Sequence, residues 1–68
     1  MIILMNKKEA LKIVQEAGLA LEDLDDSLKK DKEIVLEAVK QHGYALEYAD
    51  DSLKNDPAIL AILNKKKK

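Results

Sequence analysis

The sequence predicts an all-α protein of about two and a half tandem 25-residue helical repeats, each a longer helix followed by one or two short helical turns. The strongest observation is self-similarity, because residues 6–30 align with residues 31–55 and twelve of the 25 aligned pairs are identical. The composition agrees, since alanine, leucine, glutamate and lysine, which all favour helices, dominate the 68 residues. No stretch shows the alternating pattern of a strand.

Each unit is expected to open with a long helix. Asn6, Asp31 and Asp56 occupy the same place in successive units, and all three are good N-cap residues. Glu9 follows Asn6 by three positions, which predicts a variant of the capping box. Pro57 falls at the first helical position, where proline is favoured. The helix interiors carry apolar residues at helical spacing, namely Ala10, Leu11, Val14 and Ala17, then Ile34, Val35, Leu36, Ala38 and Val39, then Ile59, Leu60, Ile62 and Leu63.

Two closely matching phrases, GLALEDLDDSLKKD and GYALEYADDSLKND, follow the first two long helices. Their glycines, Gly18 and Gly43, are expected to end these helices in a left-handed conformation, which glycine adopts without steric cost. Asp25 and Asp50 begin a further helical turn in each phrase, and we expect their carboxylates to cap it. The leucine three residues after each aspartate is then expected to turn inward.

The chain is expected to form a single domain over residues 6–64, with units 6–30 and 31–55 and a partial unit 56–64. An apolar extension, residues 1–5, precedes this domain, and a basic tail, residues 65–68, follows it. The apolar extension is too short for a secretory signal or a membrane span. It either covers an exposed end of the core or lies upstream of a chain that begins at Met5.

The unit DKEIVLEAVKQHGYALEYADDSLKND resembles the short helical repeat of domain-of-unknown-function family 4116. That family's pattern is an aspartate, a helix rich in valine and isoleucine, a glycine, an Ala-Leu pair, and a leucine and a basic residue before the next aspartate. The residues that fit it are Asp31, Ile34, Val35, Ala38, Val39, Gly43, Ala45, Leu46, Leu53 and Asp56. The resemblance implies a helical repeat array without an established activity, and it transfers no catalytic residue. Asn6 and Glu9 depart from the pattern, which suggests a terminal capping unit.

The acidic phrases raise the question of a metal site or a catalytic pair of carboxylates, and we expect neither. The stretch EDLDDSLKKDKE lacks the central glycine of a calcium loop, and Leu24 and Leu28 interrupt its alternate ligand positions. A zinc site needs more than the single histidine, His42, in a chain without cysteine. Adjacent exposed aspartates also lack the burial that separates two carboxyl pKa values. The sequence therefore predicts no enzyme activity, no cofactor and no metal.

The candidate functional residues are those that differ between the two matching units, because repeat scaffolds keep their core positions alike and vary the binding face. His42, Tyr44 and Tyr48 stand where the first unit has Ala17, Leu19 and Asp23. Tyr44 and Tyr48 are four positions apart, so they share one side of a short helix, and tyrosine is enriched at binding hot spots. The alternative is that one ring fills the junction between units and keeps its hydroxyl at the surface.

These features predict a non-enzymatic helical repeat module for protein–protein interaction, cytoplasmic and without membrane association, and either a monomer or a weak homodimer. The alternative is a small nucleic-acid- or ribosome-associated protein that uses the tail formed by Lys65, Lys66, Lys67 and Lys68. Through Asn64 the chain has eight lysines against thirteen acids, a net charge of −5, which disfavours nucleic acid as a partner. A lysine run is also typical of a solvated helix end that complements the helix dipole.

Overall fold

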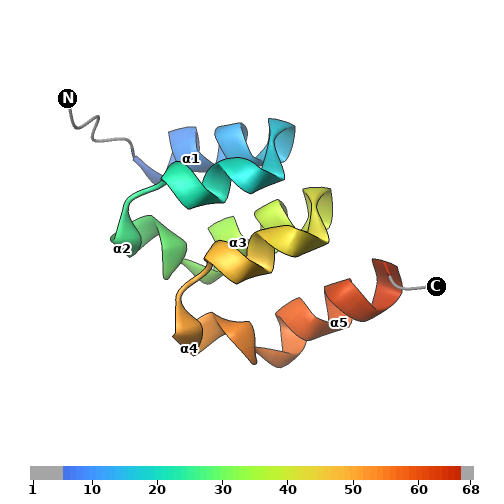
Figure 1. Cartoon of the computed structure of the whole chain (residues 1–68). Coiled ribbons are helices and arrows are strands. Elements are labelled where there is room, and N and C mark those ends of the chain that lie inside the picture. The colour runs from blue at the N-terminus through green and yellow to red at the C-terminus, as the bar shows by residue number, and fades with distance from the viewer. Residues whose placement is uncertain (1–5, 67–68) are drawn as a thin grey trace.

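The computed structural model describes residues 6–66, and all of its regular elements are helical (Figure 1). The extension Met1–Met5 and the last two lysines lie outside the described residues, as does the expectation that the extension covers the core. The elements, in chain order, are α1 (Lys7–Glu16), the 3₁₀ helix η1 (Gly18–Asp23), α2 (Asp26–Lys29), α3 (Lys32–Gln41), the 3₁₀ helix η2 (Gly43–Tyr48), α4 (Asp51–Lys54) and α5 (Pro57–Lys66). The predicted all-α fold class is therefore confirmed.

Corresponding elements have equal lengths and start 25 residues apart. The helices α1 and α3 each have 10 residues, η1 and η2 each have 6, and α2 and α4 each have 4. Figure 1 shows α1, α3 and α5 one below another, with η1 and η2 lying in front of α1 and α3. Contacts run from α1 to α3, from α3 to α5 and from η1 to η2, so like elements pack on like elements.

The three predicted caps of the long helices are confirmed. Asn6 and Glu9 form a capping box, in which the Glu9 N–H donates to Asn6 Oδ1 at 2.8 Å and the Asn6 N–H donates to Glu9 Oε1 at 3.2 Å. Asp31 accepts from the second and third backbone N–H groups of α3 at 3.0 and 3.4 Å, and Asp56 does so in α5 at 2.9 and 3.4 Å. Each carboxylate thus satisfies donors that a helix start leaves unpaired.

The acidic phrases also act as caps, as predicted. Asp25 and Asp50 each accept from the backbone N–H and the hydroxyl of the serine two residues later, with N···O distances of 3.3 and 3.0 Å. These hydrogen bonds, led by the one from the serine hydroxyl, hold the pKa of both carboxyls below its usual value. The inward leucines are half-buried Leu28 and buried Leu53.

The prediction of left-handed glycines at the ends of α1 and α3 is wrong. The C-cap residues are Ala17, with φ −144° and ψ 90°, and His42, with φ −152° and ψ 112°, so both helices end in extended backbone. Gly18 and Gly43 instead begin the 3₁₀ helices, and no glycine in the described part of the chain has a positive φ. In both cases a 3₁₀ helix begins at the glycine, one residue after the C-cap, so no left-handed glycine cap is formed.

Close packing between units explains the glycine at position 18. A Cβ atom added to Gly18 would lie 2.6 Å from the carbonyl oxygen of Ala38 and 3.1 Å from the Cβ atoms of Gln41 and His42. The end of α3 therefore approaches the backbone of η1 too closely for any side chain there. Gly18 sets the distance between the first two units.

The apolar core runs through the junctions between the long helices. Its buried members are Ala10, Val14, Leu21, Leu24, Ile34, Val35, Ala38, Val39, Ala45, Leu46, Ala49, Leu53 and Ile59. Ala38 is fully buried because α1 and η1 pack on α3, whereas Ile13, at the same place in α1, is 37% exposed. At the other end, exposed Asn64 occupies the place of the buried Val14 and Val39.

The C-terminal helix extends further than the predicted domain boundary. α5 runs through Lys66, so Lys65 and Lys66 continue the helix instead of starting a separate tail. None of the described helices is both long enough and apolar enough to cross a lipid bilayer.

Candidate functional site

Tyr44 and Tyr48 come together on η2. Their ring centroids are 5.8 Å apart and their planes meet at 81°, an edge-to-face arrangement that aromatic pairs favour. Tyr44 is 60% exposed, the highest value among the exposed large hydrophobic side chains. Tyr48 is half-buried and packs against the core. The pair therefore combines an anchored ring with a ring that faces solvent.

Tyr48 also lies close to acidic side chains from two units. The pKa of its hydroxyl is raised above the usual value, first by burial and then by the negative charge of Glu22 on η1, with smaller effects of Tyr44 and Glu47. Glu22 and Glu47 correspond to each other in the 25-residue register. The negative charges of carboxylates from both 3₁₀ helices thus act on the Tyr48 hydroxyl.

His42 lies at the opposite end of η2 from Tyr48. It is the C-cap residue of α3 and is exposed; its backbone N–H donates to the Ala38 carbonyl oxygen at 2.9 Å. Its own carbonyl oxygen accepts from the Ala45 N–H, also at 2.9 Å. The structure therefore places His42 at the junction where α3 meets η2, two residues before Tyr44.

An open groove of about 250 Å³ runs beside Tyr48, between the short turns of the two units. It is lined by Asp26, Lys29, Tyr48, Ala49, Asp50 and Asp51. The turns are tied together by a backbone hydrogen bond, in which the Asp50 N–H donates to the Lys29 carbonyl oxygen at 3.2 Å. The groove thus lies where α2 meets the segment that joins η2 to α4. Sequence reasoning missed Asp26 and Lys29 because they lie 22 and 19 positions before Tyr48 in the chain.

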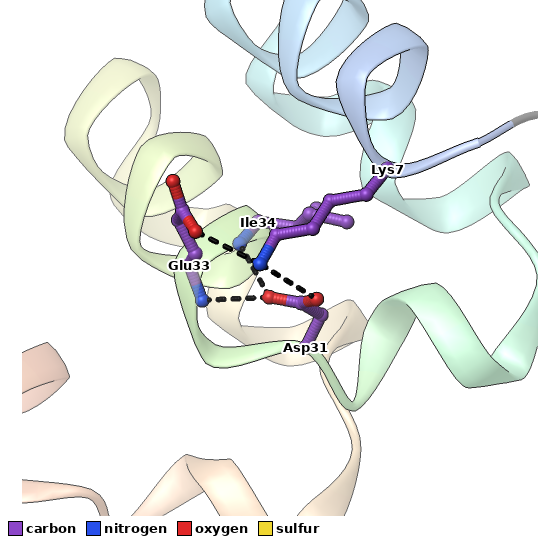
Figure 2. A network of polar contacts seen from close by, with 4 residues as sticks. All are labelled: Lys7, Asp31, Glu33 and Ile34. Atoms are coloured by element: carbon purple, nitrogen blue, oxygen red, sulfur yellow. Dashed lines mark hydrogen bonds and ion pairs between the residues drawn. The ribbon is translucent and has the colours of Figure 1, made fainter.

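Ion pairs connect the start of each long helix to the cap of the next. Lys7 Nζ lies 3.3 Å from Asp31 Oδ2 and 2.8 Å from Glu33 Oε1, as Figure 2 shows. Lys32, at the corresponding place in α3, lies 3.4 Å from Asp56 Oδ2. Sequence reasoning missed these contacts, although Lys7 and Lys32 are identical residues in the 25-residue register and each directly follows a cap.

The other charged groups singled out in the sequence do not form a compact site. Within residues 6–66, no three histidine, aspartate or glutamate side chains are grouped so that they could hold a metal ion. Of the four lysines in the predicted tail, Lys65 is exposed on α5, Lys66 ends that helix, and the last two lie outside the described residues.

The comparisons with known proteins agree with the resemblance found in the sequence. A model of the family described as "Domain of unknown function (DUF4116)" matches residues 6–60, from the cap of α1 into α5. No curated protein and no solved structure matches the chain. Because the family match covers more than half of the chain, and both complete sets of helices, the protein belongs to the DUF4116 family.

Proposed function

We propose that this chain is a stack of 25-residue helical repeats that acts in the cytoplasm as a non-enzymatic module for protein–protein interaction. The surface that meets the partner is formed by Tyr44 and Tyr48. The observation that carries the proposal is the edge-to-face pair itself, in which a 60% exposed ring rests on a half-buried one. Large exposed aromatic groups with an anchored base are typical of the residues that dominate binding energy at interfaces.

The repeat interpretation rests on three contacts that recur at the same spacing. The aspartate cap of a long helix, the ion pair to the preceding lysine and the aspartate–serine cap of the short turn each occur twice, 25 residues apart. In such an array, each unit buries its apolar face against its neighbours and leaves the remaining face for binding. The tyrosines lie on the second unit, which has a neighbour on both sides.

The non-enzymatic part of the proposal rests on the groove beside Tyr48. Its lining contains three carboxylates, one lysine and the tyrosine, without the single histidine of the chain. The carboxylate of Asp50 is occupied by the cap of α4. The groove is wide open to solvent, so the others lack the dry surroundings that would separate their pKa values for acid–base work.

The test is affinity capture from extracts of the source cell with three forms of the chain. The wild-type protein should retain a protein partner that Tyr44→Ala loses, because removal of the exposed ring removes the centre of the contact. Leu19→Ala is the matched control, since Leu19 holds the same place in η1 and is 39% exposed. It should retain the partner. Circular dichroism of each variant verifies that the helices remain folded.

Two results would contradict the proposal. If Tyr44→Ala retains every protein that the wild-type chain retains, the tyrosine pair is not the binding surface. If removal of Lys65–Lys68 abolishes all capture and nuclease treatment does the same, the chain associates through nucleic acid and its lysine tail instead.

A further inference from the structure

The surface around the tyrosine pair has a chemical character that restricts its partner. We propose that it binds a peptide segment in which arginine or lysine side chains alternate with apolar ones. This inference rests on the proposed function, because it assigns a class of partner to the same surface. It follows from the groove beside Tyr48, the exposed ring of Tyr44 and the sign of the surrounding charges.

The aromatic part of the surface suits a long cationic side chain. Arginine and lysine lay their apolar stems along hydrophobic surface and keep the charged head in water. Their cationic heads are attracted to the face of a tyrosine ring within about 6 Å. Tyr44 presents one ring to solvent, and that ring packs edge to face with the half-buried ring of Tyr48. A preordered ring loses little conformational freedom when a partner binds.

The charges around the two tyrosine rings also favour a cationic partner. Asp26, Asp50 and Asp51 line the groove against one lysine, Lys29. Glu22 and Glu47 add two carboxylates close enough to Tyr48 to act on its hydroxyl. Two further lysines offset part of this negative charge. Lys30 and Lys54 both act on Asp50, and Lys54 Nζ is 3.3 Å from Asp51 Oδ1. Five carboxylates therefore face three ammonium groups, and the excess is negative.

The shape of the groove favours an extended segment over a single ligand. The groove is open, holds about 250 Å³ and runs between α2 and α4, with Tyr48 in its lining and the ring of Tyr44 packed against that of Tyr48. An apolar side chain of a bound segment can lie against the exposed ring of Tyr44, while its cationic neighbours reach Asp26 in the groove and the carboxylates that act on Tyr48. Alternation of the two kinds of side chain places them on these different parts of the surface.

The experiment uses two short blocked peptides, one in which arginine alternates with leucine and one in which glutamate replaces arginine. Each is added to the isotope-labelled chain, and two-dimensional NMR follows the backbone amides. The arginine peptide should shift the amides of η2 and the first residues of α2 and α4, and high salt should weaken its binding. The glutamate peptide should leave these amides unchanged.

Single substitutions show which residues contribute to binding of the arginine peptide. Tyr44→Ala should weaken the arginine peptide about two- to fivefold, the change that corresponds to an exposed cation–π contact. Leu19→Ala, the matched control, should bind as the wild-type chain does. Asp26→Asn should weaken binding by up to about fivefold, as expected for a lost surface charge pair. Glu16→Gln, which removes an exposed charge from the end of α1, is its control.

Several results would overturn the inference. Equal binding of the glutamate peptide would show that the surface selects apolar side chains and ignores charge. Shifts confined to other helices, or none with either peptide, would exclude a basic partner here, and so would a single-stranded oligonucleotide that shifts the same amides more strongly. If partner capture still depends on Tyr44 in any of these cases, the proposed function stands and only the basic character of the partner is wrong.

Discussion

The amino group of Lys7 lies 3.3 Å from the carboxylate of Asp31, the residue that caps α3. One unit later, Lys32 repeats this contact with Asp56, the cap of α5, at 3.4 Å. Each aspartate thus accepts two backbone N–H groups of its own helix and also faces the lysine of the preceding helix. The same carboxylate starts a helix and joins it to its neighbour.

A double-mutant cycle with Lys7→Met and Asp31→Asn should show a small favourable coupling in urea unfolding. Both side chains keep contact with solvent, at 48% exposure for Lys7 and 25% for Asp31, so the contribution of the pair lies at the weak end for ion pairs and should vanish in high salt. Asparagine keeps the cap, so the cycle reports the charge alone. Hydrogen bonds from Lys7 to Glu33 and to Asp31 raise the lysine pKa above 10.5. The coupling is therefore present at neutral pH and is lost as the pH rises through the raised pKa of Lys7.

The control for that cycle is Lys8→Met combined with Asp31→Asn, since Lys8 is the exposed neighbour of Lys7. It should show no coupling. A coupling of equal size in the control, or one that persists in high salt, would contradict a direct contact between Lys7 and Asp31.

Gly18→Ala should destabilise the protein by roughly 1–3 kcal/mol, the usual cost of overpacking. The added Cβ would lie 2.6 Å from the Ala38 carbonyl oxygen, and backbone cannot move aside as a flexible side chain can. The direction of the stability change is informative, because a glycine-to-alanine substitution usually stabilises a protein by about 0.4–1 kcal/mol where space and conformation allow alanine. Urea unfolding should show a lower midpoint with an unchanged slope. An equal or higher midpoint would mean that the first two units do not approach this closely.

Ile34→Val should cost about 0.5–1.5 kcal/mol, the range for removal of one buried methylene. Ile34 is fully buried in the core, in the first turn of α3. Ile13→Val removes the same atoms from a side chain that is 37% exposed, so it should cost clearly less. Thermal and urea unfolding of the two variants side by side measure the difference. Equal losses would indicate that Ile13 is also covered in solution.

Tyr48 should ionise above pH 10 in an ultraviolet titration of Tyr44→Phe, in which it is the only tyrosine. Burial is the main reason that its pKa is raised above 10.0, and the charge of Glu22 comes next. Glu22→Gln should therefore lower the midpoint of the titration slightly. Since the folded-state pKa is the higher one, the associated stability is complete below pH 10 and is lost as the pH rises through the raised value. A midpoint below pH 10 would contradict the burial of Tyr48.

The helix caps could be predicted from the sequence because capping is local. Asn6 with Glu9, and Asp25 with its serine two residues later, are complete within four consecutive residues. The 25-residue register then predicts the corresponding cap 25 residues later. The proximity of Tyr44 and Tyr48 could be anticipated from their short separation in the chain, but the i, i+4 alignment expected of an α-helix does not apply to η2, a 3₁₀ helix in which residues three apart are aligned.

The role of Gly18 could not be predicted locally. A glycine after a helix has two common causes, a left-handed backbone and a close approach by another segment. The sequence alone does not distinguish them, because both require glycine. Only the position of α3 shows that the second cause applies. The contact between Lys7 and Asp31 was missed for a related reason, since it depends on two long helices that begin side by side although 24 positions separate the residues.

The shared carboxylates also couple the formation of one long helix to that of its neighbour. Nucleation is the costly step in forming a helix, because several residues are fixed for the first hydrogen bond. Asp31 and Asp56 act at that step, and each is oriented by a lysine that precedes it in the chain. Once α1 is formed, Lys7 favours the arrangement that starts α3, and Lys32 then does so for α5. The coupling also holds in reverse, so each long helix that forms favours its neighbours on both sides.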